Sequence, residues 1–229
     1  MSPVTRSVLP LALLLAAACG AGGDAPGAAA DSLAAAPPAP ATQPSTPAAA
    51  APAWRTNPAS GITVTPGEVT TIEAGPHAIL WPEGAAELAP PYSVRASLRK
   101  RAGRLHEGYG LIFGGTGLEG PEAEQRYSYF LVRGDGSYLI KRRDGTQLPV
   151  VRDWTRHPDV TRDAGGQGRP NDLEVRVGAD SVTFLVNGGT VATVPAAELS
   201  TRGRAGLRVS HDVQLEAQGF TARPGTVVP

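Results

Sequence analysis

The sequence predicts an all-β domain in which many short strands form a sandwich or a barrel. Three observations predict this fold class. Apolar residues alternate with polar ones in several segments, Asp-Gly and Asn-Gly pairs separate those segments, and no segment carries a convincing helical stripe of apolar residues. We expect a turn of helix only in PAAEL at 195–199.

The alternation is clearest in YSVRASL at 92–98, where every second residue is apolar or aromatic. The segments DLEVRV at 172–177 and DVQLEA at 212–217 repeat this period of two, which is typical of a strand with one buried face. Asp135-Gly136 divides RYSYFLVR from SYLIKRR, and Asn187-Gly188 marks a later turn. Both pairs suit tight hairpins because their residues tolerate positive φ.

The first 18 residues predict an export signal. Arg6 supplies a short positive region, and the apolar run that follows at 8–18 is shorter than the about 20 residues a membrane-spanning helix needs. Ala16-Ala17-Ala18 would also suit an ordinary signal peptidase, in which case Cys19 is incidental. Together with Cys19, however, the three alanines resemble the bacterial lipobox, whose cysteine becomes the lipidated first residue of the mature chain.

Chemistry favours lipidation of Cys19. It is the chain's one cysteine, so it has no partner for a disulfide, and a free thiol is a liability in an oxidising compartment. Acylation removes the thiol and supplies an anchor. The resemblance implies a lipoprotein of the bacterial cell envelope. The residue after the cysteine is Gly20 and not an aspartate, and in this the sequence resembles lipoproteins that are sorted to the outer membrane.

Composition divides the chain further. Residues 19–53 are nearly all Ala, Pro, Gly, Ser and Thr and contain no aromatic side chain, which predicts a disordered tether because too little apolar surface is available to offset the entropy of ordering. From Trp54 onward the aromatic residues and nearly all charges appear, so we expect one domain at 54–225.

Several segments of this domain resemble concanavalin A-like lectin/glucanase domains, the jelly-roll family that includes laminin-G-type modules. They are YGLIFGG (109–115), YSYFLVRGDGSYLI (127–140), RPNDLEVRVG (169–178), DSVTFLVNGGTVATV (180–194) and GRAGLRVSHDVQLEAQGF (203–220). The resemblance covers residues 93–222 and implies an antiparallel β-sandwich of the jelly-roll type. It leaves function open, since this scaffold carries lectins, hydrolases and protein-binding modules.

Known catalytic patterns are missing from the sequence. A glucanase of the resembled family would carry E-x-D-x-x-E along one strand, and no such string occurs. The acids Glu119, Glu122 and Glu124 crowd a loop, where we expect them to be solvated. A G-x-G-x-x-G string at 115–120 is interpreted as a glycine loop, because Pro121 follows it and no crossover helix fits before the next strand. We therefore favour a protein without enzymatic activity.

We expect neither a cofactor nor nucleic acid as a partner. The four histidines are scattered without metal-ligand spacing, although the resembled family sometimes binds calcium, which keeps a calcium site open. Lys and Arg number 21 and Asp and Glu number 21, so no global field attracts nucleic acid. The basic segment RKRAGRLH at 99–106 would suit an anionic polysaccharide or lipopolysaccharide phosphates, but we favour a charged hairpin tip that blocks edge pairing.

Aromatic side chains are the best candidates for binding a ligand, because sugar faces pack on aromatic rings while amides and guanidinium groups bind hydroxyls. Loops between strands are where such groups tend to gather. The candidate residues are Trp154, His157, Tyr127, Tyr129, Tyr109, Arg169 and Asn171.

The leading hypothesis is a lipid-anchored extracytoplasmic binding module that recognises carbohydrate without catalysis. One alternative is a glycoside hydrolase of the 3-keto-disaccharide type, since LVNGGTV at 185–191 and GRAGLRVSH at 203–211 are similar to the later strands of that family. A second alternative is a protein-binding or structural envelope lipoprotein.

Overall fold

The structure is a computed structural model that describes residues 52–163 and 168–225. The predicted signal peptide, Cys19 and almost all of the tether lie outside the described residues. No helix within the described ranges is long and apolar enough to cross a membrane.

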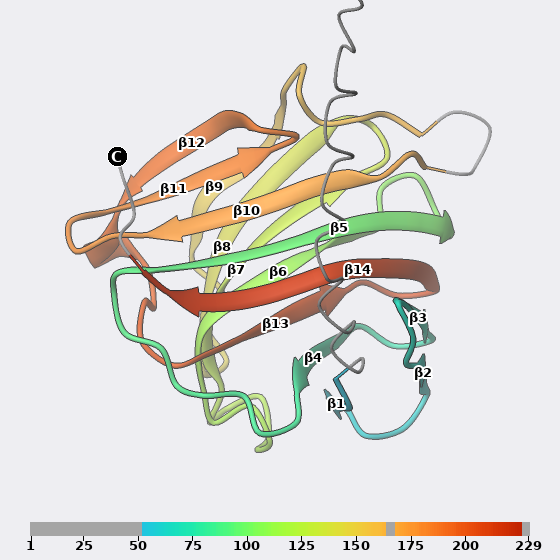
Figure 1. The fold of residues 1–229 in the computed structure, drawn as a ribbon, viewed down its shortest axis with the longest axis horizontal. Coiled ribbons are helices and arrows are strands. Elements are labelled where there is room, and N and C mark those ends of the chain that lie inside the picture. Colours follow the sequence, from blue (N-terminus) through green and yellow to red (C-terminus); the bar gives the residue numbers. More distant parts are fainter. Residues whose placement is uncertain (1–51, 164–167, 226–229) are drawn as a thin grey trace, which may run out of the picture. The chain divides into compact units, whose positions relative to one another are not determined.

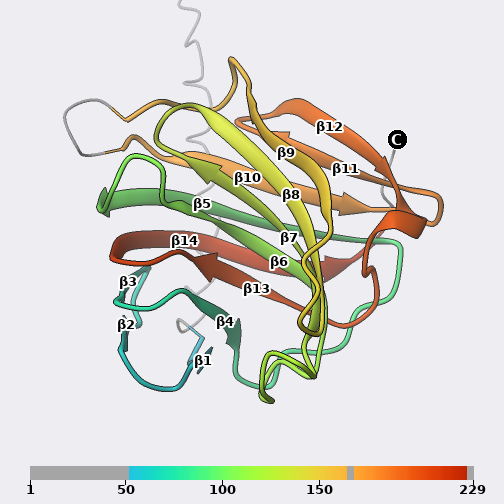
Figure 2. The same ribbon diagram turned by 180° about the vertical axis from the view of Figure 1, so that it is seen from behind.

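The described residues form two antiparallel sheets that face each other (Figures 1 and 2). We call them sheet A and sheet B. Sheet A has seven described strands, in the order β1 (Trp54–Asn57), β4 (Ala78–Pro82), β13 (Arg204–Val209), β6 (Gly108–Thr116), β7 (Arg126–Arg133), β8 (Ser137–Asp144) and β9 (Val150–Arg156).

Sheet B also has seven strands within the described ranges. Their order is β12 (Gly189–Pro195), β11 (Ser181–Val186), β10 (Asn171–Val177), β5 (Tyr92–Ala102), β14 (Val213–Pro224), β3 (Val69–Ala74) and β2 (Ile62–Thr65). A short 3-10 helix, η1 (Ala196–Glu198), lies within the segment where the sequence predicted a turn of helix. The predicted all-β antiparallel sandwich is confirmed.

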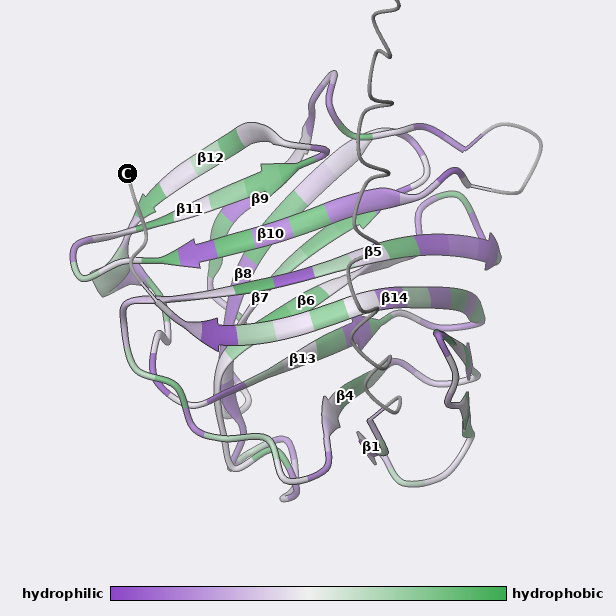
Figure 3. Cartoon of the chain, in the orientation of Figure 1, coloured by the Kyte–Doolittle hydropathy of each residue, from purple (hydrophilic) through white to green (hydrophobic). Residues whose placement is uncertain are grey.

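The predicted alternation of buried and exposed side chains is present in sheet B. Along β5 and β10 alternate side chains are buried, and green and purple residues alternate on these strands in Figure 3. The predicted turn at Asn187-Gly188 joins β11 to β12, and both residues have positive φ, 51° and 85°. A buried core fills the space between the sheets, where Phe130 packs against Phe184 and Tyr138.

Sheet A differs because β6 and β7 are buried on both faces. Their burial is almost continuous along the strand, as in Tyr109 to Phe113 of β6. Phe130 and Val132 of β7 belong to the core between the sheets, whereas Tyr129 and Leu131 belong to a second, separate apolar cluster. Sheet A therefore has an outer face that is also covered.

The basic segment at 99–106 does not form the expected hairpin tip. It spans the end of β5 and the connection to β6, and these strands lie in different sheets. Arg99 and Arg101 both pair with Glu216 on the neighbouring strand β14. The hairpin interpretation is wrong because the chain crosses from one layer of the sandwich to the other at this point.

Lys100 of the same segment points inward. Its side chain is 1% exposed, and Nζ lies 2.7 Å from Oδ2 of Asp163, which is 4% exposed. Nζ also donates to the carbonyl oxygen of Arg104 at 3.1 Å. Asp163 belongs to the connection between β9 and β10, so this buried ion pair ties that connection to the turn after β5.

Replacing Lys100 by methionine should lower the free energy of unfolding by about 3 to 5 kcal/mol, because it leaves the buried Asp163 carboxylate without its cation. Urea denaturation would measure the loss. The double variant Lys100→Met/Asp163→Leu should recover much of it, since both charges are then gone. A single variant as stable as the wild type would show that the pair is not buried as described.

Candidate functional site

The outer face of sheet A carries four large aromatic side chains. Trp81 comes from β4, Tyr127 and Tyr129 from β7, and Trp154 from β9; the first three are at most 4% exposed, and Trp154 is half-buried. We call this surface the aromatic face. Its side chains alternate along the strands with those that fill the space between the sheets, as a pleated sheet requires.

Glycines of β6 leave room on the aromatic face. Gly108 pairs with Arg133 of β7, and a Cβ atom at Gly108 would lie 3.0 Å from Cη2 of Trp154. Because Gly108 has no side chain, the indole can extend from the edge strand β9 towards β6. Gly110 is required for a different reason, since a Cβ atom there would collide with the carbonyl oxygen of Phe130.

Arginine side chains lie over the aromatic rings. The guanidinium carbon of Arg133 is 4.3 Å from the ring centre of Trp154, and that of Arg208 is 4.8 Å from the ring centre of Tyr129. Cations in such positions are attracted to the negative face of the ring. Burial raises the pKa of the Tyr129 hydroxyl, and the charge of Arg208 acts in the opposite direction. Tyr129 is therefore neutral beneath the arginine.

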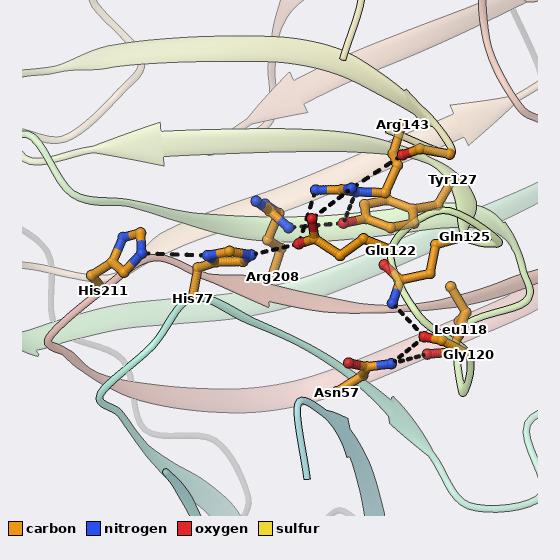
Figure 4. Close-up of polar contacts among 11 residues, drawn as sticks. Asn57, His77, Leu118, Gly120, Glu122, Gln125, Tyr127, Arg143, Arg208 and His211 are labelled. Carbon is orange, nitrogen blue, oxygen red and sulfur yellow. Dashed lines mark hydrogen bonds and ion pairs between the residues drawn. The ribbon is translucent and has the colours of Figure 1, made fainter. Parts of the chain in front are cut away.

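The hydroxyl of Tyr127 holds two arginines in place (Figure 4). It accepts hydrogen bonds from Nε of Arg143 at 3.2 Å and from Nη1 of Arg208 at 2.8 Å. The guanidinium of Arg143 is 4% exposed and also donates to the carbonyl oxygen of Gly145 at 3.1 Å. These contacts fix the two guanidinium groups, so the charges on the aromatic face are preorganised.

Glu122 joins this network from the loop at 117–125. Its carboxylate lies 3.3 Å from both terminal nitrogens of Arg143 and 3.1 Å from Nε2 of His77. Nδ1 of His77 in turn lies 3.3 Å from Nε2 of His211 (Figure 4). The hydrogen bond to His77, with the charge of Arg143, lowers the pKa of Glu122 below its usual value of 4.5.

The same loop is held against the sheet by a side-chain amide. Nδ2 of Asn57 on β1 donates to the carbonyl oxygens of Leu118 and Gly120, each at 2.8 Å (Figure 4). Leu118 is fully buried in the apolar cluster of the aromatic face. The loop acids Glu119, Glu122 and Glu124 reach solvent, as expected. Two of them also form ion pairs, Glu122 with Arg143 and Glu119 with Arg204.

The structure brings some of the predicted site residues together and separates others. Tyr127, Tyr129 and Trp154 share the aromatic face. His157 and Arg169 line a separate pocket beside the end of β9. Tyr109 and Asn171 are fully buried and bonded to each other, with Nδ2 of Asn171 donating to the Tyr109 hydroxyl at 3.1 Å.

Sequence reasoning missed Trp81, Arg143, Arg208 and Glu122. The two arginines had a usable signal, because each lies at an outward position of a strand that also carries inward apolar residues. Glu122 and His77 had none, since they are 45 residues apart and meet only in the folded chain.

No three His, Cys, Asp or Glu residues come close enough to hold a metal ion in the part of the chain that the structure describes. The arrangement of the aromatic face instead provides donors and rings. Guanidinium groups can donate to hydroxyls or oxyanions, the exposed part of Glu122 can accept, and the half-buried Trp154 offers an apolar surface.

Comparisons with known proteins place the fold in one class. No family model matches the sequence, and no curated protein matches it. Among solved structures, the carbohydrate-binding module CBM66 from Bacillus subtilis matches with a TM-score of 0.58 at 13% identity, over 76% of this chain and 97% of that chain. A Bacillus subtilis protein of unknown function with a galectin-like fold matches with a TM-score of 0.52 at 12% identity, over 74% and 88%.

The described domain therefore has the concanavalin A-like jelly-roll fold that the sequence resemblance implied. At these identities the likeness concerns the fold.

Proposed function

We propose that this protein is a non-catalytic carbohydrate-binding module whose ligand lies on the aromatic face. The observation that carries the proposal is the set of guanidinium groups held in fixed positions over aromatic rings on the outer face of sheet A. CBM66 from Bacillus subtilis, which has a similar fold, is by its name a carbohydrate-binding module. This likeness supports the proposed function.

The solvent exposure of the residues on the aromatic face indicates which of them can contact a ligand and which support the others. Tyr127 and Tyr129 are too deeply buried to stack on a sugar and instead support Arg208, which is itself half-buried. Trp154 and Glu122 are accessible from solvent, so they can contact the ligand directly. One sugar of a glycan chain would pack its C–H groups on the indole, while hydroxyls of other sugars in the same chain accept from Arg208 and donate to Glu122.

A glycan array probed with the purified full chain tests this function. We expect selective binding, weakened about tenfold or more by Arg208→Gln because a hydrogen bond from a charged group is lost. Trp154→Ala should weaken binding as well. The matched control is Arg95→Gln, which removes an exposed arginine from sheet B and should leave binding unchanged. Binding to no glycan, or equal binding by all three variants, would refute the proposal.

A second candidate function is glycoside hydrolysis of the 3-keto-disaccharide type. The observation that favours it is the contact between Glu122 and His77, which puts a carboxylate and an imidazole together at the edge of the aromatic face. The test is whether the wild type releases reducing or keto sugar from disaccharides and Glu122→Gln does not. That result would show that the protein is a hydrolase and not a non-catalytic binding module.

We further propose that Cys19 is lipidated and anchors the protein to the bacterial cell envelope, at the outer membrane. The lipobox-like Ala16-Ala17-Ala18-Cys19 supports this location, and the Ala/Pro-rich segment after it would space the domain from the lipid surface. Several acyl chains hold a protein durably, because each buried methylene contributes about 0.8 kcal/mol.

Cys19→Ser should therefore move the protein from the membrane fraction to the soluble fraction, and metabolic labelling with palmitate should mark the wild type alone. Fractionation followed by immunoblotting measures both proteins. A wild type that is already soluble would indicate plain secretion, and a variant that stays with the membrane would rule out Cys19 as the anchor.

A further inference from the structure

A second surface feature lies beside the aromatic face. It is an open pocket of about 580 Å³ beside the end of β9, lined by described residues of the segment that follows this strand and by Arg169 before β10. Arg156, His157, Thr161, Arg162 and Arg169 line it. We call it the arginine pocket.

The backbone of the arginine pocket is held in place. Val160 is buried in the core, and the backbone nitrogen of Thr161 donates to Oδ1 of the buried Asn171 at 2.8 Å. His157 donates its backbone N–H to the carbonyl oxygen of Gly136 at 3.1 Å, and Nδ2 of Asn187 donates to the carbonyl oxygen of Asp159 at 2.7 Å. Arg156 and Arg162 thus flank a segment that is held in place.

Three of the described residues that line the pocket are arginines, and none of these lining residues is an acid. Among the described residues, the guanidinium groups of Arg156, Arg162 and Arg169 have no hydrogen bond and no ion pair. Other exposed arginines, such as Arg95, are unpaired as well, but these three line one pocket. One of the two acids in the described part of the connection is neutralised by a lysine outside the pocket.

Asp163 pairs with Lys100, and Oδ2 of Asp159 lies 3.6 Å from Nδ1 of His157. The chain as a whole has no net charge, so three free guanidinium groups around one pocket form a local feature. Guanidinium groups bind carboxylates, sulfates and phosphates through paired hydrogen bonds.

The pocket adjoins the aromatic face. Arg156 pairs in register with Ser137, which in turn pairs with Arg133, so Arg156 lies on the outer side of sheet A with Arg133. Trp154 precedes Arg156 by two residues on the same strand, a backbone rise of about 7 Å, so both side chains lie on the outer side of sheet A. A single glycan chain can therefore contact the indole and the pocket together.

We infer that the arginine pocket binds the anionic group of an acidic glycan, a uronate carboxylate or a sulfate ester. This inference rests on the proposed function and narrows its ligand class, because it selects acidic over neutral polysaccharides. Binding should weaken as ionic strength rises, since salt screens exposed charges.

The experiment compares the full chain with two triple variants. The pocket variant is Arg156→Gln/Arg162→Gln/Arg169→Gln. The matched control, Arg95→Gln/Arg202→Gln/Arg223→Gln, removes the same charge from exposed arginines that do not line the pocket. Calorimetry would measure binding to polygalacturonate, dextran sulfate, neutral dextran and inorganic phosphate. Thermal melting would check that both variants fold as the wild type does.

We expect the pocket variant to bind polygalacturonate or dextran sulfate at least about tenfold more weakly than the wild type, while the control keeps full affinity. Which polymer is affected distinguishes carboxylate from sulfate. Equal losses of affinity in the two variants would overturn the inference, because they would indicate unspecific charge attraction. If the wild type binds phosphate but no polysaccharide, the inference that the pocket binds a glycan is overturned.

The two proposals fail in different ways. Neutral glycans that bind on the array, with no acidic polymer bound in calorimetry, would overturn the acidic ligand and leave the binding module intact. The absence of any glycan binding by the wild type would overturn both.

Discussion

The burial of sheet A on both of its faces is the constraint on which the rest of the structure depends. One face contributes to the core between the sheets, as in any sandwich. The other carries Tyr127, Tyr129 and Trp81, which are almost as inaccessible as the core itself. Such a face cannot be left to water, and here it is covered by arginine side chains, by Trp154 and by the loop at 117–125. The surface that closes over the sheet is therefore also the surface that can bind.

Arginine suits this position because it is apolar along its stem and charged at its end. Arg208 covers the ring of Tyr129 and also donates to the hydroxyl of Tyr127. This one hydrogen bond gives the buried hydroxyl of Tyr127 a partner and orients the guanidinium group of Arg208. Arg143 is almost fully buried and has Tyr127 and Glu122 as partners. The cost of burying its charge is offset by these partners. The result is a surface whose polar groups would need little rearrangement to bind the proposed ligand.

The sequence was sufficient for strands whose burial alternates, such as β5 and β10, and for the turn at Asn187-Gly188. Tyr127 and Tyr129 were among its candidate ligand-binding residues, and both lie on the aromatic face. A period of two assigns residues to faces but does not say which face meets the other sheet. Tyr109 was a candidate alongside these tyrosines because it is aromatic, yet it pairs in register with Val132 and fills the core. Contacts between distant loops, such as His77 with Glu122, left no trace in the local pattern.

The central claim is that a glycan contacts the outer face of sheet A at Trp154. The chain has three tryptophans, and each gives one indole N–H signal in a heteronuclear NMR spectrum. During titration with a glycan that binds on the array, the account predicts that the Trp154 signal shifts most, because Trp81 is buried and Trp54 packs against Phe220. A titration in which the Trp54 signal shifts while that of Trp154 stays in place would contradict it.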